Sequence, residues 1–137
     1  MSLLFLILAS ICNAVMDVCS YKFSKSVFNN SDIKFKLFGF PFKRFFDPSW
    51  RQLNKEKTFK LLFWTVKQPL QFCDGWHFPK MLMIGFIIIA IILYHPILTF
   101  TNIWILNRLM DFVLYSVAWN VTFNVFYDIY LIRKVEK

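Results

Sequence analysis

The stretch that decides the fold runs from Asp74 to Phe100 and reads DGWHFPKMLMIGFIIIAIILYHPILTF. Its first seven residues, here called the DGWHFPK segment (residues 74–80), combine charged, aromatic and helix-breaking side chains. The following residues, 81–94, carry no polar side chain except the hydroxyl of Tyr94. A long apolar run directly after a polar, aromatic segment predicts a helix that enters a membrane.

The start of this helix can be placed from its residues. Asp74 or Gly75 can cap it, and Pro79 suits the first turn, because the N–H that proline lacks would be unpaired there. From Pro79 to the end of the apolar run a helix rises about 24 Å, less than a hydrocarbon core of about 30 Å. We therefore predict a bend before Pro96 and a span that covers residues 79–100.

Composition places the whole chain in the same class. At 137 residues there is room for one domain, and its 58% hydrophobic residues come in long blocks, which indicates a membrane protein. The formal charge of +8 could suggest nucleic acid as a partner. However, twelve of the sixteen Lys and Arg residues lie between residues 20 and 80, beside apolar segments. That placement favours a cytoplasmic loop over anionic lipid and argues against nucleic-acid binding.

Residues 2–19 form the first predicted span. A cleaved secretory signal is the alternative, but no Lys or Arg precedes the apolar run, so a retained helix is favoured. Ser10, Asn13 and Asp17 share one face of this helix. A carboxylate at the centre of a membrane helix costs about 2.5–3.5 kcal/mol, so Asp17 implies a partner or water even near the end of the span.

The predicted cytoplasmic loop, residues 20–78, alternates basic and phenylalanine side chains in its first half. We interpret it as an amphipathic, aromatic-rich segment on the bilayer surface, with lysines at the headgroups and rings among the acyl chains. Residues 58–66 could form a short amphipathic helix that cannot span. The predicted residues for binding lipid or anionic headgroups are Lys80, Lys43, Arg44 and Trp76.

The third predicted span covers residues 112–131. Ser116, Asn120, Asn124 and Asp128 follow one another at steps of four, which makes a polar stripe along an apolar helix. Such a stripe is expected to face other helices and not lipid.

Three spans place the chain termini on opposite sides of the membrane. With the basic loop inside, the N-terminus is outside and the C-terminus cytoplasmic, which satisfies the positive-inside rule. Depth along the helices then predicts one polar cluster in the inner leaflet. Besides the DGWHFPK segment, it contains Asn13, Asp17, Asn120, Asn124 and Asp128.

Metal chemistry has little support in the sequence. The three cysteines, Cys12, Cys19 and Cys73, show no zinc-type spacing and are interpreted as small packing residues. His77 and His95 lie some 27 Å apart along a helix, so they cannot share a metal. We predict no metal and no cofactor.

The order Asp74-x-Trp76-His77-x-x-Lys80 before an apolar span resembles small, uncharacterised bacterial integral membrane proteins. Asn13-x-x-x-Asp17 in the first span fits the same resemblance. It implies an all-α protein of the bacterial inner membrane and carries no known activity.

Three functions remain open at this point. The first is a membrane scaffold or accessory subunit that binds a membrane protein partner or its own copy, a homo-oligomer. The second is a lipid-active enzyme in which His77, oriented by Asp74 or Asp17, acts as general acid or base. The third is a proton or ion pathway along the stripe of the third span in an oligomer. The chain has no nucleophile elbow, zinc-protease motif or phosphate-binding loop, and we favour a non-catalytic role.

Overall fold

The computed structural model describes residues 1–29, 33–51, 58–61, 64–67, 72, 74–99 and 101–132. Three long helices dominate it: α1 (Ser2–Tyr21), α4 (His77–Ile92) and α5 (Trp104–Asn124). A π-helical segment, η4 (Val125–Leu131), continues α5 without a break. The described residues are mostly helical, which confirms the predicted all-α class in part, because four short strands are also present.

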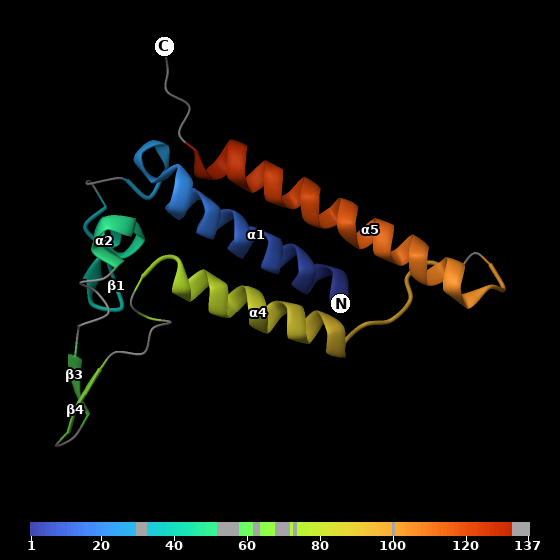
Figure 1. Cartoon of the computed structure of the whole chain (residues 1–137), viewed down its shortest axis with the longest axis horizontal. Helices are drawn as coiled ribbons and strands as arrows, with labels where there is room; N and C mark the ends of the chain where they lie inside the picture. The colour runs from blue at the N-terminus through green and yellow to red at the C-terminus, as the bar shows by residue number, and fades with distance from the viewer. Residues whose placement is uncertain are drawn as a thin grey trace, which may run out of the picture.

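Helix α1 lies between the other two (Figure 1). It runs antiparallel to α4 and in the same direction as α5 (Figure 1). Its small residues allow this central position, because Ala9, Ser10 and Ala14 are fully buried where neighbouring helices approach closely. Two hydrogen bonds tie α1 to α5: one joins the hydroxyls of Ser2 and Tyr115, and Ser10 Oγ donates to the Trp119 carbonyl at 2.8 Å.

Two helices are long and apolar enough to cross a membrane, namely α1 and the continuous helix Trp104–Leu131. They differ in their surroundings, since 39% of the most apolar stretch of α1 is buried inside the molecule but only 6% of that of the last helix. Helix α4 is strongly apolar but shorter, with 16 residues that rise about 24 Å. The last helix therefore leaves most of its surface uncovered.

The helix bounds correct the sequence prediction in two places. The first helix agrees with the predicted span 2–19 within two residues. The second ends at Ile92, two residues before the predicted helix end at Tyr94, and residues 93–99 are not helical. The third begins at Trp104, eight residues before the predicted start, because its mixed first turns are still helical.

The described residues of the connection between α1 and α4 form short elements. They are η1 (Phe23–Lys25), β1 (Lys36–Leu37), β2 (Phe40–Pro41), α2 (Phe42–Phe46), η2 (Pro48–Trp50), β3 (Thr58–Leu61) and β4 (Trp64–Lys67). The strands form two antiparallel hairpins, β1–β2 and β3–β4. The short helix predicted over residues 58–66 is wrong, because this segment forms the hairpin β3–β4. A lone helix of nine residues is marginal, and threonine, valine and aromatic residues favour strands.

Aromatic rings of this connection pack on one another at one end of the helices. Phe28, Phe40 and Phe45 are 7%, 3% and 0% exposed, and Phe28 stacks on Phe46 with ring centroids 4.2 Å apart. The prediction that the rings of the loop lie among acyl chains is therefore wrong for these buried residues. Aromatic rings are removed from water equally well when they pack against one another as when they contact lipid.

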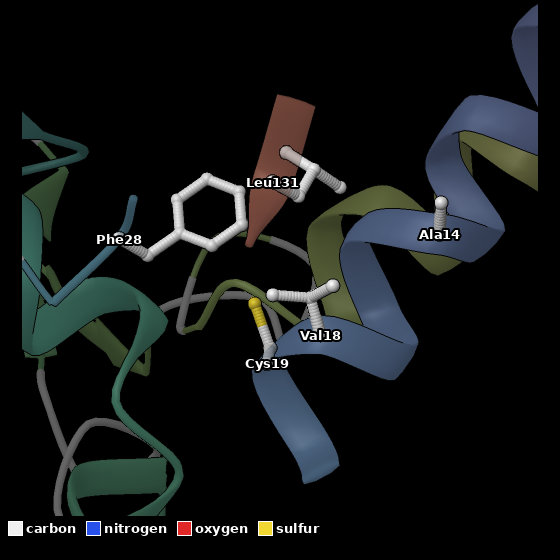
Figure 2. Packing of buried hydrophobic residues seen from close by; sticks show 5 residues of the cluster. All are labelled: Ala14, Val18, Cys19, Phe28 and Leu131. Atoms are coloured by element: carbon white, nitrogen blue, oxygen red, sulfur yellow. The ribbon is translucent and has the colours of Figure 1, made fainter. Parts of the chain in front are cut away.

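The same end of the molecule contains the main apolar core. Figure 2 shows Phe28 and Leu131 converging on Val18 and Cys19 near the end of α1. The Val27 N–H donates to the Leu131 carbonyl at 2.9 Å, which fixes the end of η4 against the chain that follows α1. Cys19 is fully buried in this core, as its predicted packing role requires, whereas Cys73 lies outside the described residues.

Candidate functional site

Asp74 is the buried centre of the DGWHFPK segment, with only 2% of its surface exposed. Its Oδ1 accepts hydrogen bonds from the N–H groups of Trp76 and His77, both at 2.9 Å. Its own carbonyl accepts the Phe78 N–H at 3.2 Å, the first bond of the turn that leads into α4. Asp74 therefore caps α4, as one of the two alternatives from the sequence predicted.

Gly75 anchors this cap to the aromatic connection. Its N–H donates to the Phe45 carbonyl at 2.6 Å. A Cβ atom at this position would overlap the ring of Phe46, so the close approach of the two segments requires glycine. The start of α4 is thus held against helix α2 by the backbone.

His77 pairs with the same carboxylate. Its Nδ1 lies 2.8 Å from Asp74 Oδ2, so the carboxylate holds both the backbone and the ring of residue 77. The ring also packs edge-on against Trp76, with centroids 4.9 Å apart. With Nδ1 engaged, Nε2 is the ring nitrogen left for chemistry or for a ligand.

Two basic side chains gather on Trp76. The Lys80 Nζ lies 4.5 Å from the centroid of the indole, and the guanidinium carbon of Arg51 lies 5.4 Å from it. Arg51 Nε is 3.9 Å from Asp74 Oδ1, which is too far for a hydrogen bond, and this buried nitrogen has no hydrogen-bond partner. No motif in the sequence pointed to Arg51, and the structure places its side chain beside the cap of α4.

The other predicted headgroup-binding residues lie nearby in the chain but make different contacts. The Arg44 guanidinium lies 4.3 Å from the Trp50 ring centroid. Lys43 is exposed on α2. Neither has a described contact with the DGWHFPK segment, so the structure brings together Lys80 and Trp76 from the predicted set and adds Arg51.

The predicted polar cluster of the helices is more dispersed. Asn13 and Asp17 are half-buried on α1, whereas Asn120, Asn124 and Asp128 are exposed on the last helix. Within the described part of the chain, no hydrogen bond joins the two groups. Asp17 and Asp128 both lie within electrostatic reach of the Tyr127 hydroxyl. Ser116 and Asn120 line a cavity that Leu6 of α1 also lines, whereas Asn124 and Asp128 are exposed.

A second buried carboxylate, Asp111, lies at the opposite end of the helices and was not predicted. It is 1% exposed and accepts hydrogen bonds from the Leu98 N–H at 2.9 Å, the Ile97 N–H and the Tyr94 hydroxyl at 2.8 Å. The carboxylate fastens the α4–α5 connection to α5. Its place at the edge of an apolar helix was visible in the sequence, but its partners are backbone groups that carry no sequence signal.

The comparisons add no relative to this description. No protein-family model, curated protein or solved structure matches the chain. The geometry of residues 51 and 74–80 is therefore the basis for the functional conclusions.

Proposed function

We propose that the chain is a three-span protein of a bacterial inner membrane, with the N-terminus outside and the DGWHFPK segment at the cytoplasmic side. The two helices long enough to cross a bilayer support this, as does the antiparallel course of α4 beside them. The concentration of basic residues between residues 20 and 80 supports the orientation. Helix α4 is about 24 Å long, which is shorter than the hydrocarbon core. Either local thinning of the bilayer or the non-helical residues after α4 can make up the difference.

Within that membrane, the proposed role is that of a scaffold or accessory subunit that binds a transmembrane helix of a partner or of a second copy. One observation carries this proposal: only 6% of the most apolar stretch of the last helix is buried, and Asn120, Asn124 and Asp128 on this helix are exposed. Asn120 donates to the Ser116 carbonyl of its own helix at 2.8 Å, but Asn124 and Asp128 have no hydrogen-bond partner among the described residues. Amide and carboxylate groups facing acyl chains are costly, whereas another helix can satisfy them.

A site-specific photo-cross-linker tests the proposed interface. We expect a cross-linker at Val121, which is exposed beside the stripe, to form a protein adduct in intact membranes, and the same group at the exposed Ile92 of α4 to react with lipid. An adduct of twice the mass of the chain identifies a second copy. The change Asn124→Leu should abolish the adduct from position 121. Lipid adducts alone at both positions would contradict the proposed role.

A lipid-active enzyme is the second candidate, and the 2.8 Å contact between His77 and Asp74 favours it. In a hydrolysis, His77 Nε2 would take a proton from water as the water oxygen bonds to the carbon of a lipid ester. The bond from that carbon to the leaving oxygen then breaks, and the departing alcohol takes the proton from His77. Asp74 would hold the ring and stabilise its charged form.

Lipid turnover in proteoliposomes tests this second candidate. Mass spectrometry of the lipids should show a product that forms with the unchanged protein and with His95→Ala but is lost with His77→Ala. Histidine 95 is the matched control because it is exposed and distant in the chain from the Asp74 pair. Equal product formation with His77→Ala would exclude this enzyme.

A further inference from the structure

The cap of α4 holds more positive than negative charge. Arg51 and Lys80 both lie on the Trp76 ring, and the one carboxylate beside them, Asp74, already accepts two backbone N–H groups and the ring nitrogen of His77. Arg51 approaches that carboxylate only to 3.9 Å and makes no hydrogen bond to it. Apart from this pair with Asp74, neither cation has a salt-bridge partner among the described residues.

The unpaired hydrogen-bond donor of Arg51 indicates which kind of ligand could bind here. Its Nε is buried and has no hydrogen-bond partner, although the side chain as a whole is 30% exposed. A buried donor without a partner is costly, and an anion beside it would remove that cost. The guanidinium fork matches phosphate oxygens in pairs, and a lysine ammonium adds a point charge that can reach a third oxygen.

The position of Arg51, Trp76 and Lys80 at the start of α4 indicates whether the phosphate belongs to a lipid or to a soluble molecule. Trp76 lies where the polar residues end and fourteen apolar residues begin, a level at which tryptophan and lysine meet lipid headgroups. A soluble phosphate ester would gain nothing from the adjacent apolar helix, whereas a phospholipid could lay its acyl chains along it. Anionic headgroups also gather at the cytoplasmic surface.

We propose that Arg51 and Lys80, held on the indole of Trp76, bind the phosphate of an anionic phospholipid at the start of α4. This site goes beyond the proposed role of the last helix and does not depend on it. The carboxylate of Asp74 positions the site by capping α4 and contacts no ligand itself. The His77 ring packs edge-on against the same indole, with ring centroids 4.9 Å apart.

Native mass spectrometry of the full chain in mild detergent, titrated with phosphatidylglycerol, tests the site. We expect the paired change R51Q and K80Q to weaken binding by about tenfold or more, since two charged contacts are lost. The matched control is Arg108→Gln, because Arg108 also lies over an aromatic ring, that of Tyr94 at 4.8 Å, but at the other end of α4. Its affinity should match that of the unchanged protein.

Further arms separate the alternatives. Arg51→Lys keeps the charge without the fork, so it should fold and bind phosphatidylglycerol with intermediate affinity; full affinity in this variant and in the double variant overturns the proposal. An equal loss in Arg108→Gln overturns it in favour of unspecific charge attraction. Glycerol phosphate that binds as tightly as phosphatidylglycerol overturns the lipid assignment and indicates a soluble phosphate ester. Far-UV circular dichroism confirms that each variant retains its helices.

Discussion

Asp74 combines three tasks in one buried carboxylate: it caps α4, orients His77 and lies beside Arg51. The first task followed from its position before an apolar run with a proline in the first turn. The pairing with His77 was expected as one of two options, and Asp17 was the other. The structure shows that Asp74 is the partner of His77. The two residues are only three positions apart, so their contact needs no long-range packing.

Removal of the carboxylate should therefore be costly. Asp74→Ala is expected to lower the free energy of unfolding by about 2–4 kcal/mol, because the cap is lost and the half-buried His77 ring loses its hydrogen-bond partner. Asp47→Ala is the matched control, since Asp47 caps the short helix η2 through Ser49 at a more open site, and should cost about 1 kcal/mol or less. Denaturation in detergent, followed by circular dichroism, measures both. Equal losses would show that Asp74 has no special role.

The two glycines of α4 and its cap should respond in opposite ways to the same substitution. Gly75→Ala places a methyl group in the Phe46 ring and is expected to destabilise the protein by about 1–3 kcal/mol. Gly85→Ala meets open space in mid-helix and should be neutral or stabilise by up to about 1 kcal/mol. The midpoints of thermal unfolding compare them directly. A tolerated Gly75→Ala would contradict the close approach of α2 and the cap.

At the scale of elements, the helices were predictable and their connections were not. The first helix could be predicted from its long apolar block. Such a block must be buried whichever residues it packs against, so composition alone indicates the helix. The hairpin β3–β4 pairs neighbouring residues, and the strand preference of its threonine, valine and aromatic residues decided between strand and short helix. The aromatic packing around Phe45 includes Phe78, a contact between segments far apart in the chain that no local pattern reveals. The stripe of the last helix was placed by α-helical steps of four. The π-helical turns of η4 change the angle per residue before Asp128 is reached.

Asp111 gives a test at this scale. Asp111→Ala should free the backbone N–H groups of Ile97 and Leu98. Hydrogen exchange at these two amides is expected to rise by about tenfold or more, since a hydrogen bond to a charged group is worth about 1.5–3 kcal/mol. Asp128→Asn is the control, because Asp128 is exposed and has no described partner there. Unchanged exchange in Asp111→Ala would mean that the connection is held by other contacts.

At the scale of the whole molecule, the three helices form an incomplete bundle. Helix α1 lies between its two neighbours (Figure 1), and the last helix carries three exposed polar side chains, Asn120, Asn124 and Asp128. The sequence placed Asn120, Asn124 and Asp128 correctly on one helix and could not tell whether their partner belongs to the same chain. Because α1 offers them no hydrogen bond, the partner proposed here is another transmembrane helix.

The mass of the particle in native nanodiscs, cut from the membrane without detergent, tests this central proposal most directly. We predict a particle that contains a second copy of the chain or one other membrane protein, at a fixed stoichiometry. The variant Asn124→Leu should separate into single chains with their helices intact. A single chain surrounded by lipid alone, in the unchanged protein, would contradict the proposed scaffold or accessory role.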